Sequence, residues 1–130
     1  MKLPGALHRT TLLAVTLALG VSAADAAERL LGSYTARISP EDLRSEDGFH
    51  LKTPGQVIRQ DRANVHKGRF IDKEDQLDPF YDKRSSRERL ERMLDQQGGI
   101  DLRTREAIKR GDAVIKVQVY RNKVGIKLMY

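Results

Sequence analysis

The amino-acid sequence predicts an α+β fold in which a small antiparallel sheet, made of an N-terminal strand and a C-terminal β-hairpin, packs against two to three amphipathic helices. Three observations lead to this prediction. Residues 34–38 alternate apolar and polar side chains, residues 113–130 alternate in two stretches, and residues 53–110 carry helical spacing with helix-capping residues. Because a lone hairpin is barely stable, the N-terminal strand is expected to join it and the helices to cover its apolar face.

The beginning of the chain has the pattern of a secretory signal peptide, residues 1–26. Lys2 and Arg9 give a charged start, residues 12–19 form a short apolar centre, and small residues follow. The apolar run is shorter than the ~20 residues that a membrane-spanning helix needs. We therefore expect a cleaved signal and a mature chain that does not span the membrane.

Cleavage is expected after Ala26, with Ala24 as the alternative, because small residues stand at the positions that a signal peptidase reads. Residues 27–130 are then enough for one α+β domain that folds unaided. The chain has no cysteine, so neither a disulfide nor a lipid anchor is expected. The expected location is the bacterial periplasm or the exterior.

The charge of the chain favours an anionic partner. Residues 27–130 hold 22 basic and 17 acidic side chains, a net charge of +5. Acidic residues gather in segments 41–47 and 72–82, whereas residues 113–130 contain no acid. A basic surface attracts nucleic acid, anionic lipid or anionic glycan. Export makes nucleic acid the least expected of the three.

The strands and the first loop follow from side-chain alternation and turn residues. The first strand, residues 34–38, stops at Ser39-Pro40, and the polar segment that follows is expected to be a loop with at most one helical turn. Residues 113–120 and 124–130 form the hairpin around a short turn that contains Asn122.

The first helix is predicted from its end signals. Thr53 is the expected N-cap, Pro54 takes the first helical position, and Gln56 completes a capping box. The helix should run to about Lys67 and end at Gly68.

Two further helices are expected before the hairpin. Ser85 and Glu88 repeat the capping-box pattern, and Gly98-Gly99 should end that helix. A shorter helix is expected over residues 102–110, with Asp101 as its N-cap.

On the first helix, one acidic residue falls on the apolar face. Val57, Ile58 and Val65 define this face, Asp61 lies in its middle, and Asn64 lies at its edge. A buried carboxylate needs hydrogen bonds or a charged partner. Asp61 and Asn64 are therefore expected to be structural polar residues.

Beside that face, Arg59, Arg62 and His66 are spaced to form one outward cationic line. Such a line can bind a phosphate or carboxylate of a ligand or partner. It can equally pair with the acids of segment 72–82 if that segment folds back. Internal pairing is favoured, because charge runs are usually matched locally.

The acidic segment 72–82 does not form an EF-hand. A loop starting at Asp72 would need Gly and Glu where Leu77 and Lys83 stand. A looser calcium site stays open, since oxygen ligands need no fixed spacing. We expect no metal site and no cofactor.

The sheet offers a second candidate surface. Arg37, Lys116 and Lys127 can share the face away from the helices with Gln118 and Tyr120. Cations beside an aromatic ring suit an anionic glycan or a partner protein. The alternative is a solvated face whose lysines prevent edge pairing.

Residues that could support catalysis are few. Signal cleavage leaves His50 and His66, no cysteine exists, and no serine lies in a nucleophile motif. Asp61 and His66 should point apart on their helix, which argues against a catalytic pair.

The sequence therefore favours a small exported, soluble protein of the bacterial envelope that is a non-catalytic binding or interaction domain, with an envelope protein or an anionic glycan as its partner. The alternative is a small periplasmic hydrolase or metal-dependent enzyme that uses His66, His50 and the acids of residues 72–82. A third reading is a structural or stress-related envelope protein without a discrete ligand.

Overall fold

The structure is a computed structural model that describes residues 29–130 and, before them, only Gly5 and Gly20. The predicted signal peptide and its cleavage site therefore lie outside the described residues. Within residues 29–130, no helix is both long enough and apolar enough to cross a membrane.

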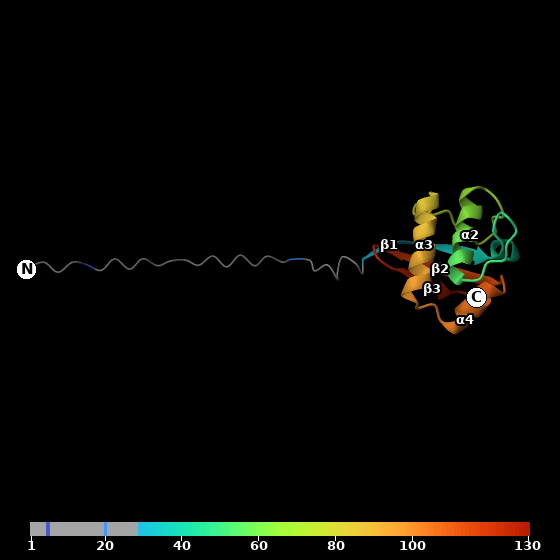
Figure 1. The fold of residues 1–130 in the computed structure, drawn as a ribbon. Coiled ribbons are helices and arrows are strands. Elements are labelled where there is room, and N and C mark those ends of the chain that lie inside the picture. Colours follow the sequence, from blue (N-terminus) through green and yellow to red (C-terminus); the bar gives the residue numbers. More distant parts are fainter. Residues whose placement is uncertain (1–4, 6–19, 21–28) are drawn as a thin grey trace, which may run out of the picture.

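The described chain forms a three-stranded sheet and three α-helices (Figure 1). In chain order the elements are β1 (Leu30–Ile38), the 3₁₀ helix η1 (Pro40–Leu43), α2 (Pro54–His66), α3 (Arg84–Gln97), α4 (Leu102–Lys109), β2 (Ala113–Tyr120) and β3 (Val124–Leu128). The predicted α+β fold, with its N-terminal strand and C-terminal hairpin, is confirmed.

The sheet is antiparallel in the order β1-β2-β3, so the central strand comes from the C-terminal hairpin. Val117 of β2 lies opposite Tyr34 of β1 and Ile126 of β3. β1 begins four residues before the predicted strand, and its register shifts between Leu30 and Gly32. Strict alternation, which predicted only the later part of β1, does not hold in this irregular stretch.

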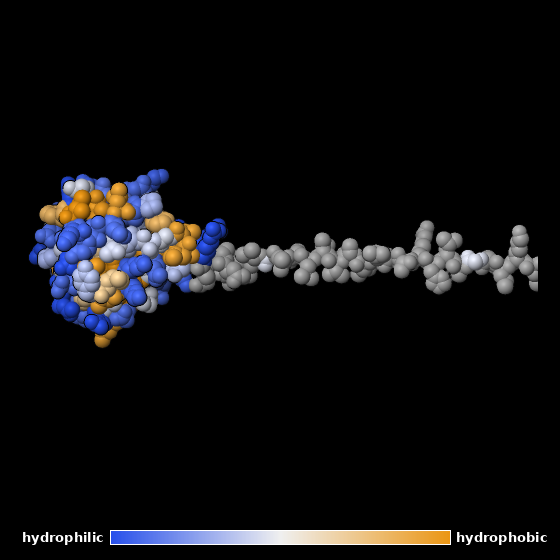
Figure 2. Space-filling view, turned by 180° about the vertical axis from the view of Figure 1, so that it is seen from behind, coloured by the Kyte–Doolittle hydropathy of each residue, from blue (hydrophilic) through white to orange (hydrophobic). Residues whose placement is uncertain are grey.

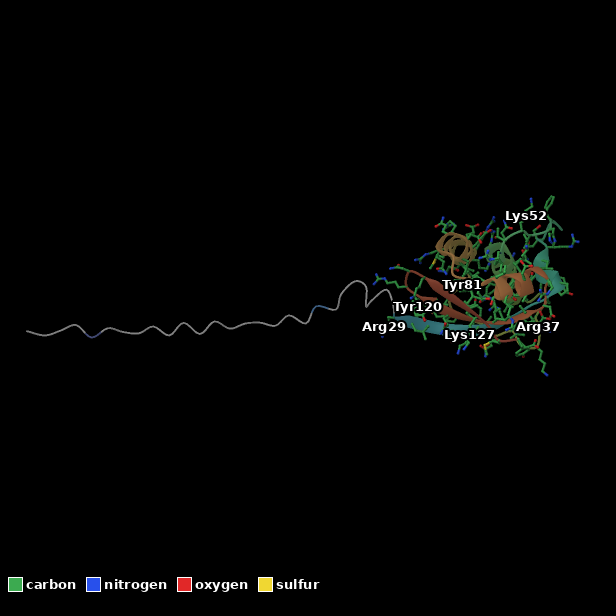
Figure 3. All side chains as sticks on the ribbon, turned by 90° about the horizontal axis from the view of Figure 1, so that it is seen from below. Arg29, Arg37, Lys52, Tyr81, Tyr120 and Lys127 are labelled. Atoms are coloured by element: carbon green, nitrogen blue, oxygen red, sulfur yellow. The ribbon has the colours of Figure 1, made fainter. Side chains whose placement is uncertain are left out.

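The helices α2 and α3 cover one face of the sheet, and the opposite face carries no helix (Figures 1 and 3). The side chains that fill the space between sheet and helices form one apolar cluster. Its fully buried members include Ala36, Ile38, Ile58, Leu90, Ile108, Ala113, Ile115 and Val117.

The first helix begins and ends where the sequence predicted. Thr53 Oγ1 accepts a hydrogen bond from the Gln56 amide at 3.1 Å, and Gln56 Oε1 accepts one from the Thr53 amide at 3.2 Å. The pair is a capping box. Gly68, two residues after the last helical residue, has a φ of 69° that favours glycine.

The start of α3 differs from the prediction. The N-cap is Lys83, its side chain makes no capping bond, and the capping box expected at Ser85 is wrong. The guanidinium of Arg87 donates to the carbonyl oxygens of Tyr81 (3.1 Å) and Asp82 (2.9 Å). These bonds hold the preceding loop against the first turn, so helical geometry begins earlier than the capping pattern suggests.

Gly55, in the first turn of α2, permits close packing against α3. A Cβ atom at this position would overlap Asp95 Oδ1 and lie 2.9 Å from the Glu91 carbonyl oxygen. The Asp95 carboxylate in turn accepts hydrogen bonds from the Gly55 amide and the Thr53 hydroxyl. The glycine lets the carboxylate of α3 cap the N-terminus of α2.

We therefore predict that Gly55→Ala destabilises the protein by about 1–3 kcal/mol, although alanine is the better helix former. Urea unfolding measures the change. Asp95→Ala alone removes the cap and creates no overlap. The double variant should lose less unfolding free energy than the two single variants together, because the added methyl group at position 55 then has more room. A Gly55→Ala protein as stable as the parent would contradict this packing.

Candidate functional site

The largest fully buried side chain is that of Arg62, which the sequence placed on an exposed flank of α2. That placement is wrong, because segment 72–82 folds back over this side of the helix. Nη1 of Arg62 donates to Asp78 Oδ2 at 3.0 Å and to the Gln76 carbonyl oxygen at 2.8 Å. Nε donates to Asp61 Oδ2 at 2.8 Å. Arg62 is thus a buried ion-pair centre.

An aromatic ring and a third carboxylate complete the surroundings of this guanidinium. Its central carbon lies 4.3 Å from the centroid of the Tyr34 ring in β1, at a distance typical of a cation–π contact. Asp75 Oδ1 lies 3.8 Å from Nη2 of Arg62. Arg62 therefore connects α2, β1 and the acidic segment.

His66 shares a carboxylate with Arg62. Its Nε2 lies 2.9 Å from Asp78 Oδ2, and only 7% of the His66 side chain is exposed. The other oxygen of Asp78 accepts the amides of Phe80 and Tyr81, both at 2.7 Å. Arg62 and His66 thus pair with an acid of segment 72–82, the internal pairing that the sequence favoured.

Arg59 pairs with different acids. Its Nη1 lies 2.8 Å from Glu91 Oε2, and its Nη2 lies 3.9 Å from Glu88 Oε1. Both glutamates belong to α3, so Arg59 joins two helices and does not reach the acidic segment. The line of three cations expected from the sequence is divided between two sets of carboxylates.

Asp61 and Asn64 are both buried, at the inward positions that the sequence indicated. They do not share one arrangement. Asp61 pairs with Arg62, whereas Asn64 Nδ2 donates to Asp42 Oδ1 at 2.9 Å. Asp42 Oδ2 accepts the Ser39 amide at 3.0 Å, so this carboxylate fixes η1 against α2.

Burial and hydrogen bonds shift the pKa values of these acids in opposite directions. It raises the pKa of Asp61 well above its usual value even though the Arg62 charge acts in the opposite direction. Burial also raises the pKa of Asp42, to about 6, against the hydrogen bonds from Ser39 and Asn64. For Asp78 burial acts upward too, but the hydrogen bonds from His66 and Arg62 outweigh it and lower the pKa.

The two histidines named for catalysis are not brought together. His66 lies in the Asp78 cluster, whereas His50 lines a separate pocket with Val57 and Lys109. Within residues 29–130, no group of three or more His, Asp or Glu side chains is placed to hold a metal ion.

Segment 72–82 also covers the outer edge of β1, which the sequence analysis missed. The Gln76 amide donates to the Thr35 carbonyl oxygen at 2.9 Å, and Gln76 Oε1 accepts the Thr35 amide at 2.9 Å. Asp75 Oδ1 accepts the Arg37 amide at 2.8 Å. These groups take the place that a fourth strand would have at the edge of β1. The contact depends on the tertiary fold and has no local sequence signal.

The open sheet face carries the other candidate residues. Lys116 and Lys127 lie directly opposite each other on β2 and β3, and Figure 3 shows Arg37 and Lys127 on the side away from the helices. Arg37 faces two acids, Glu74 at 3.7 Å and Asp112 at 3.8 Å. For the two lysines, residues 29–130 offer no carboxylate within 4.0 Å.

Tyr120, at the end of β2, borders the same face. The ammonium group of Lys123 lies 4.8 Å from the centroid of its ring. From behind, the molecule is largely hydrophilic, with hydrophobic residues in separate patches (Figure 2). This surface thus mixes polar and apolar residues, and Lys116 and Lys127 are register partners on the open face of the sheet.

Comparison of the chain with protein-family models, with curated proteins and with solved structures finds no match.

The raised pKa of Asp42 predicts a pH dependence of stability. Between its usual pKa of 3.8 and about 6, the folded state binds more protons at Asp42 than the unfolded state does. The free energy of unfolding should therefore fall as pH rises through this window, by up to about 3 kcal/mol for this group.

The comparison protein is Asp42→Asn, which cannot titrate. Both unfolding free energies are measured at pH 4, 5, 6 and 7. The value for the parent minus the value for Asp42→Asn should decrease as pH rises. A difference that stays constant with pH would show that Asp42 titrates normally.

Proposed function

We propose that this protein is an exported, non-catalytic binding domain of the bacterial envelope, and that it recognises an anionic glycan through the open face of its sheet. The observation that carries the proposal is the pair Lys116 and Lys127. The two lysines are register partners on neighbouring strands, on the face that no helix covers.

Like charges directly opposite each other in an antiparallel sheet are unfavourable. Neither lysine has a carboxylate of residues 29–130 within 4.0 Å, so the repulsion is not relieved within the described chain. An anionic group between the two ammonium groups would relieve it. The pair therefore costs stability in the free protein and favours binding of an anion.

The side chains around the lysines suit a sugar. Thr35 lies opposite Lys116 on the other neighbouring strand, and Gln118 lies between Ser33 and Gly125. Hydroxyl and amide groups can donate to and accept from sugar hydroxyls.

The ring of Tyr120 lies next to these polar groups, with the ammonium group of Lys123 over one of its faces. A Cβ atom at Gly125 would lie 3.2 Å from Gln118 Oε1 and 3.8 Å from Tyr120 Cε2. The missing side chain thus lets Gln118 and Tyr120 extend over β3. An apolar sugar face can pack against such a ring.

Export is supported by the N-terminal pattern of charged, apolar and small residues. The alternative, a hydrolase or metal-dependent enzyme, has less support. Asp78, the carboxylate beside His66, already accepts bonds from Arg62 and from two backbone amides. A fully engaged carboxylate suits a structural role for His66 better than proton transfer.

Binding to immobilised heparin, with neutral dextran as reference, tests the proposal. The parent should bind heparin at low ionic strength and not dextran. Lys116→Ala with Lys127→Ala should weaken binding at least about tenfold, since two desolvated charge contacts are lost. The matched control is Lys73→Ala with Lys83→Ala, two exposed lysines outside the three strands whose loss lowers the net charge equally. Equal losses in both double variants would contradict a specific site.

Lys127→Glu separates binding from stability. The substitution turns the like-charged pair into an opposite-charged one, so urea unfolding should show stabilisation of up to about 1 kcal/mol while heparin binding is lost. A variant that is less stable than the parent would contradict the repulsion on which the site depends.

A further inference from the structure

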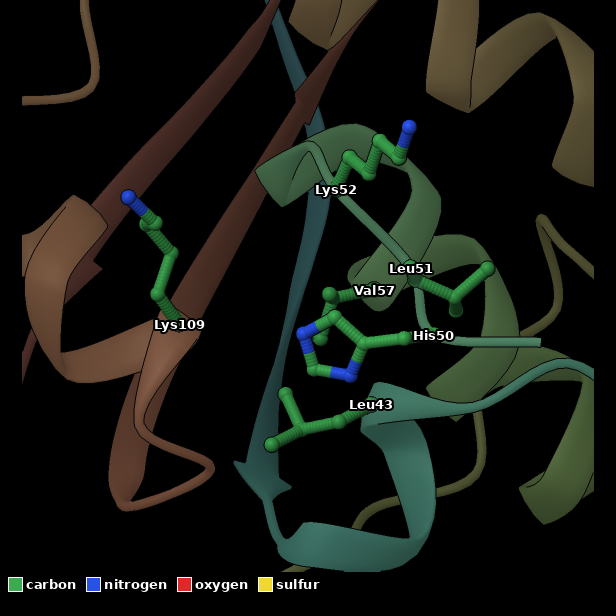
Figure 4. Close-up of a pocket in the computed structure, with 6 residues that line it drawn as sticks. All are labelled: Leu43, His50, Leu51, Lys52, Val57 and Lys109. Carbon is green, nitrogen blue, oxygen red and sulfur yellow. The ribbon is translucent and has the colours of Figure 1, made fainter. Parts of the chain in front are cut away.

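A pocket that shares no residue with the proposed glycan site lies between the segment before α2 and the end of α4 (Figure 4). Its volume is about 250 Å³. Three apolar and three basic residues line it: Leu43, Leu51, Val57, His50, Lys52 and Lys109. Not one acidic side chain is among them.

Backbone contacts hold in place the segments whose apolar side chains form the floor of this pocket. The Leu51 amide donates to the Leu43 carbonyl oxygen at 2.8 Å, and Arg44 and His50 form an antiparallel bridge. On the far side, Gly111 has a φ of 67°, and a Cβ atom there would lie 3.0 Å from Leu43 Cδ1. The floor is thus held by the fold and does not need a ligand to form.

The charged groups of the pocket have few partners of their own. Lys109 lies 3.7 Å from Glu106, an exposed pair of small energetic value. Within residues 29–130, the side chains of His50 and Lys52 have no ion pair. In Figure 4 the His50 ring lies between Leu43 and Val57, and the side chains of Lys109 and Lys52 rise at the rim with their ammonium groups directed away from the ring.

We propose that this pocket binds a small amphiphilic carboxylate. The apolar tail packs against Leu43, Leu51 and Val57. The carboxylate is held by His50 and by the two exposed lysines, whose long side chains turn toward it on binding. The apolar floor disfavours a free phosphate or a sugar. The volume lies below the ~300–1,000 Å³ of pockets for drug-sized ligands, so the ligand is short. The site shares no residue with the sheet face and stands independently of glycan binding.

Octanoate is the probe, and its binding is monitored by heteronuclear NMR of the methyl groups of the protein. Shifts should centre on Leu43, Leu51 and Val57. Acetate, which lacks the tail, and 1-octanol, which lacks the charge, should each bind at least about tenfold more weakly, because each keeps only one of the two contacts. Equal binding of octanol and octanoate would overturn the role of the cations.

The matched variants are Lys52→Ala with Lys109→Ala, and again Lys73→Ala with Lys83→Ala as the control for net charge. The first pair should weaken octanoate binding about tenfold or more, and the control should leave it unchanged. The proposal is overturned if octanoate shifts no resonance of the pocket, if its shifts spread over exposed methyl-bearing residues such as Ile71 and Leu77, or if both double variants lose affinity equally.

Discussion

The buried guanidinium of Arg62 is the interaction on which the rest of the structure depends. It joins α2 to Asp78 and to the Gln76 carbonyl oxygen, and it lies over the Tyr34 ring of β1. Burial acts to lower the pKa of Arg62, but Asp61, Tyr34 and the hydrogen bonds to Asp61 and Asp78 together outweigh it and raise the pKa, so the charge persists. Removing one partner of a buried ion pair typically costs ~3–5 kcal/mol, because the other charges stay buried.

This interaction also determines which surfaces remain available for binding. Asp75 and Asp78 of segment 72–82 turn inward toward Arg62 and His66, and Glu74 pairs with Arg37. Within residues 29–130, no acid lies within 4.0 Å of Lys116 or Lys127. Arg59 is likewise occupied by α3. Among the described residues, the open sheet face and the pocket around His50 keep cations that these acids do not reach. The internal matching of charges therefore explains how a chain with 18 acidic residues leaves distinct basic sites.

Much of the fold could be predicted from the sequence because its signals are local. The capping box of Thr53 and Gln56, the alternation of β2 and β3, and the inward position of Asp61 each depend on residues within one element. The burial of Arg62 could not be predicted. Its position in the helix fixes the side of α2 on which the side chain lies, but not which segment packs against that side. Segment 72–82, which packs on that side of α2, follows the helix in sequence but is positioned by tertiary contacts.

The same limit applies to the candidate sites. Lys116 and Lys127 could be assigned to one face, but their direct opposition depends on the register of the hairpin. The pocket around His50 joins Lys109 to residues more than fifty positions earlier, and no spacing rule connects such distant positions. Arg59 was recognised as a pairing residue, yet its partners lie on a helix whose contact with α2 requires Gly55.

The most direct test of this account is amide hydrogen exchange of Arg62→Met beside Arg59→Met, which breaks a partly exposed pair on the same helix. If Arg62 holds segment 72–82 in place, the amides of Arg37, Gln76 and Tyr81 should exchange much faster in Arg62→Met, while the amides that pair β2 with β3 keep more of their protection. Arg59→Met should leave the three amides protected. Unchanged exchange at these amides in Arg62→Met would contradict the central role of Arg62.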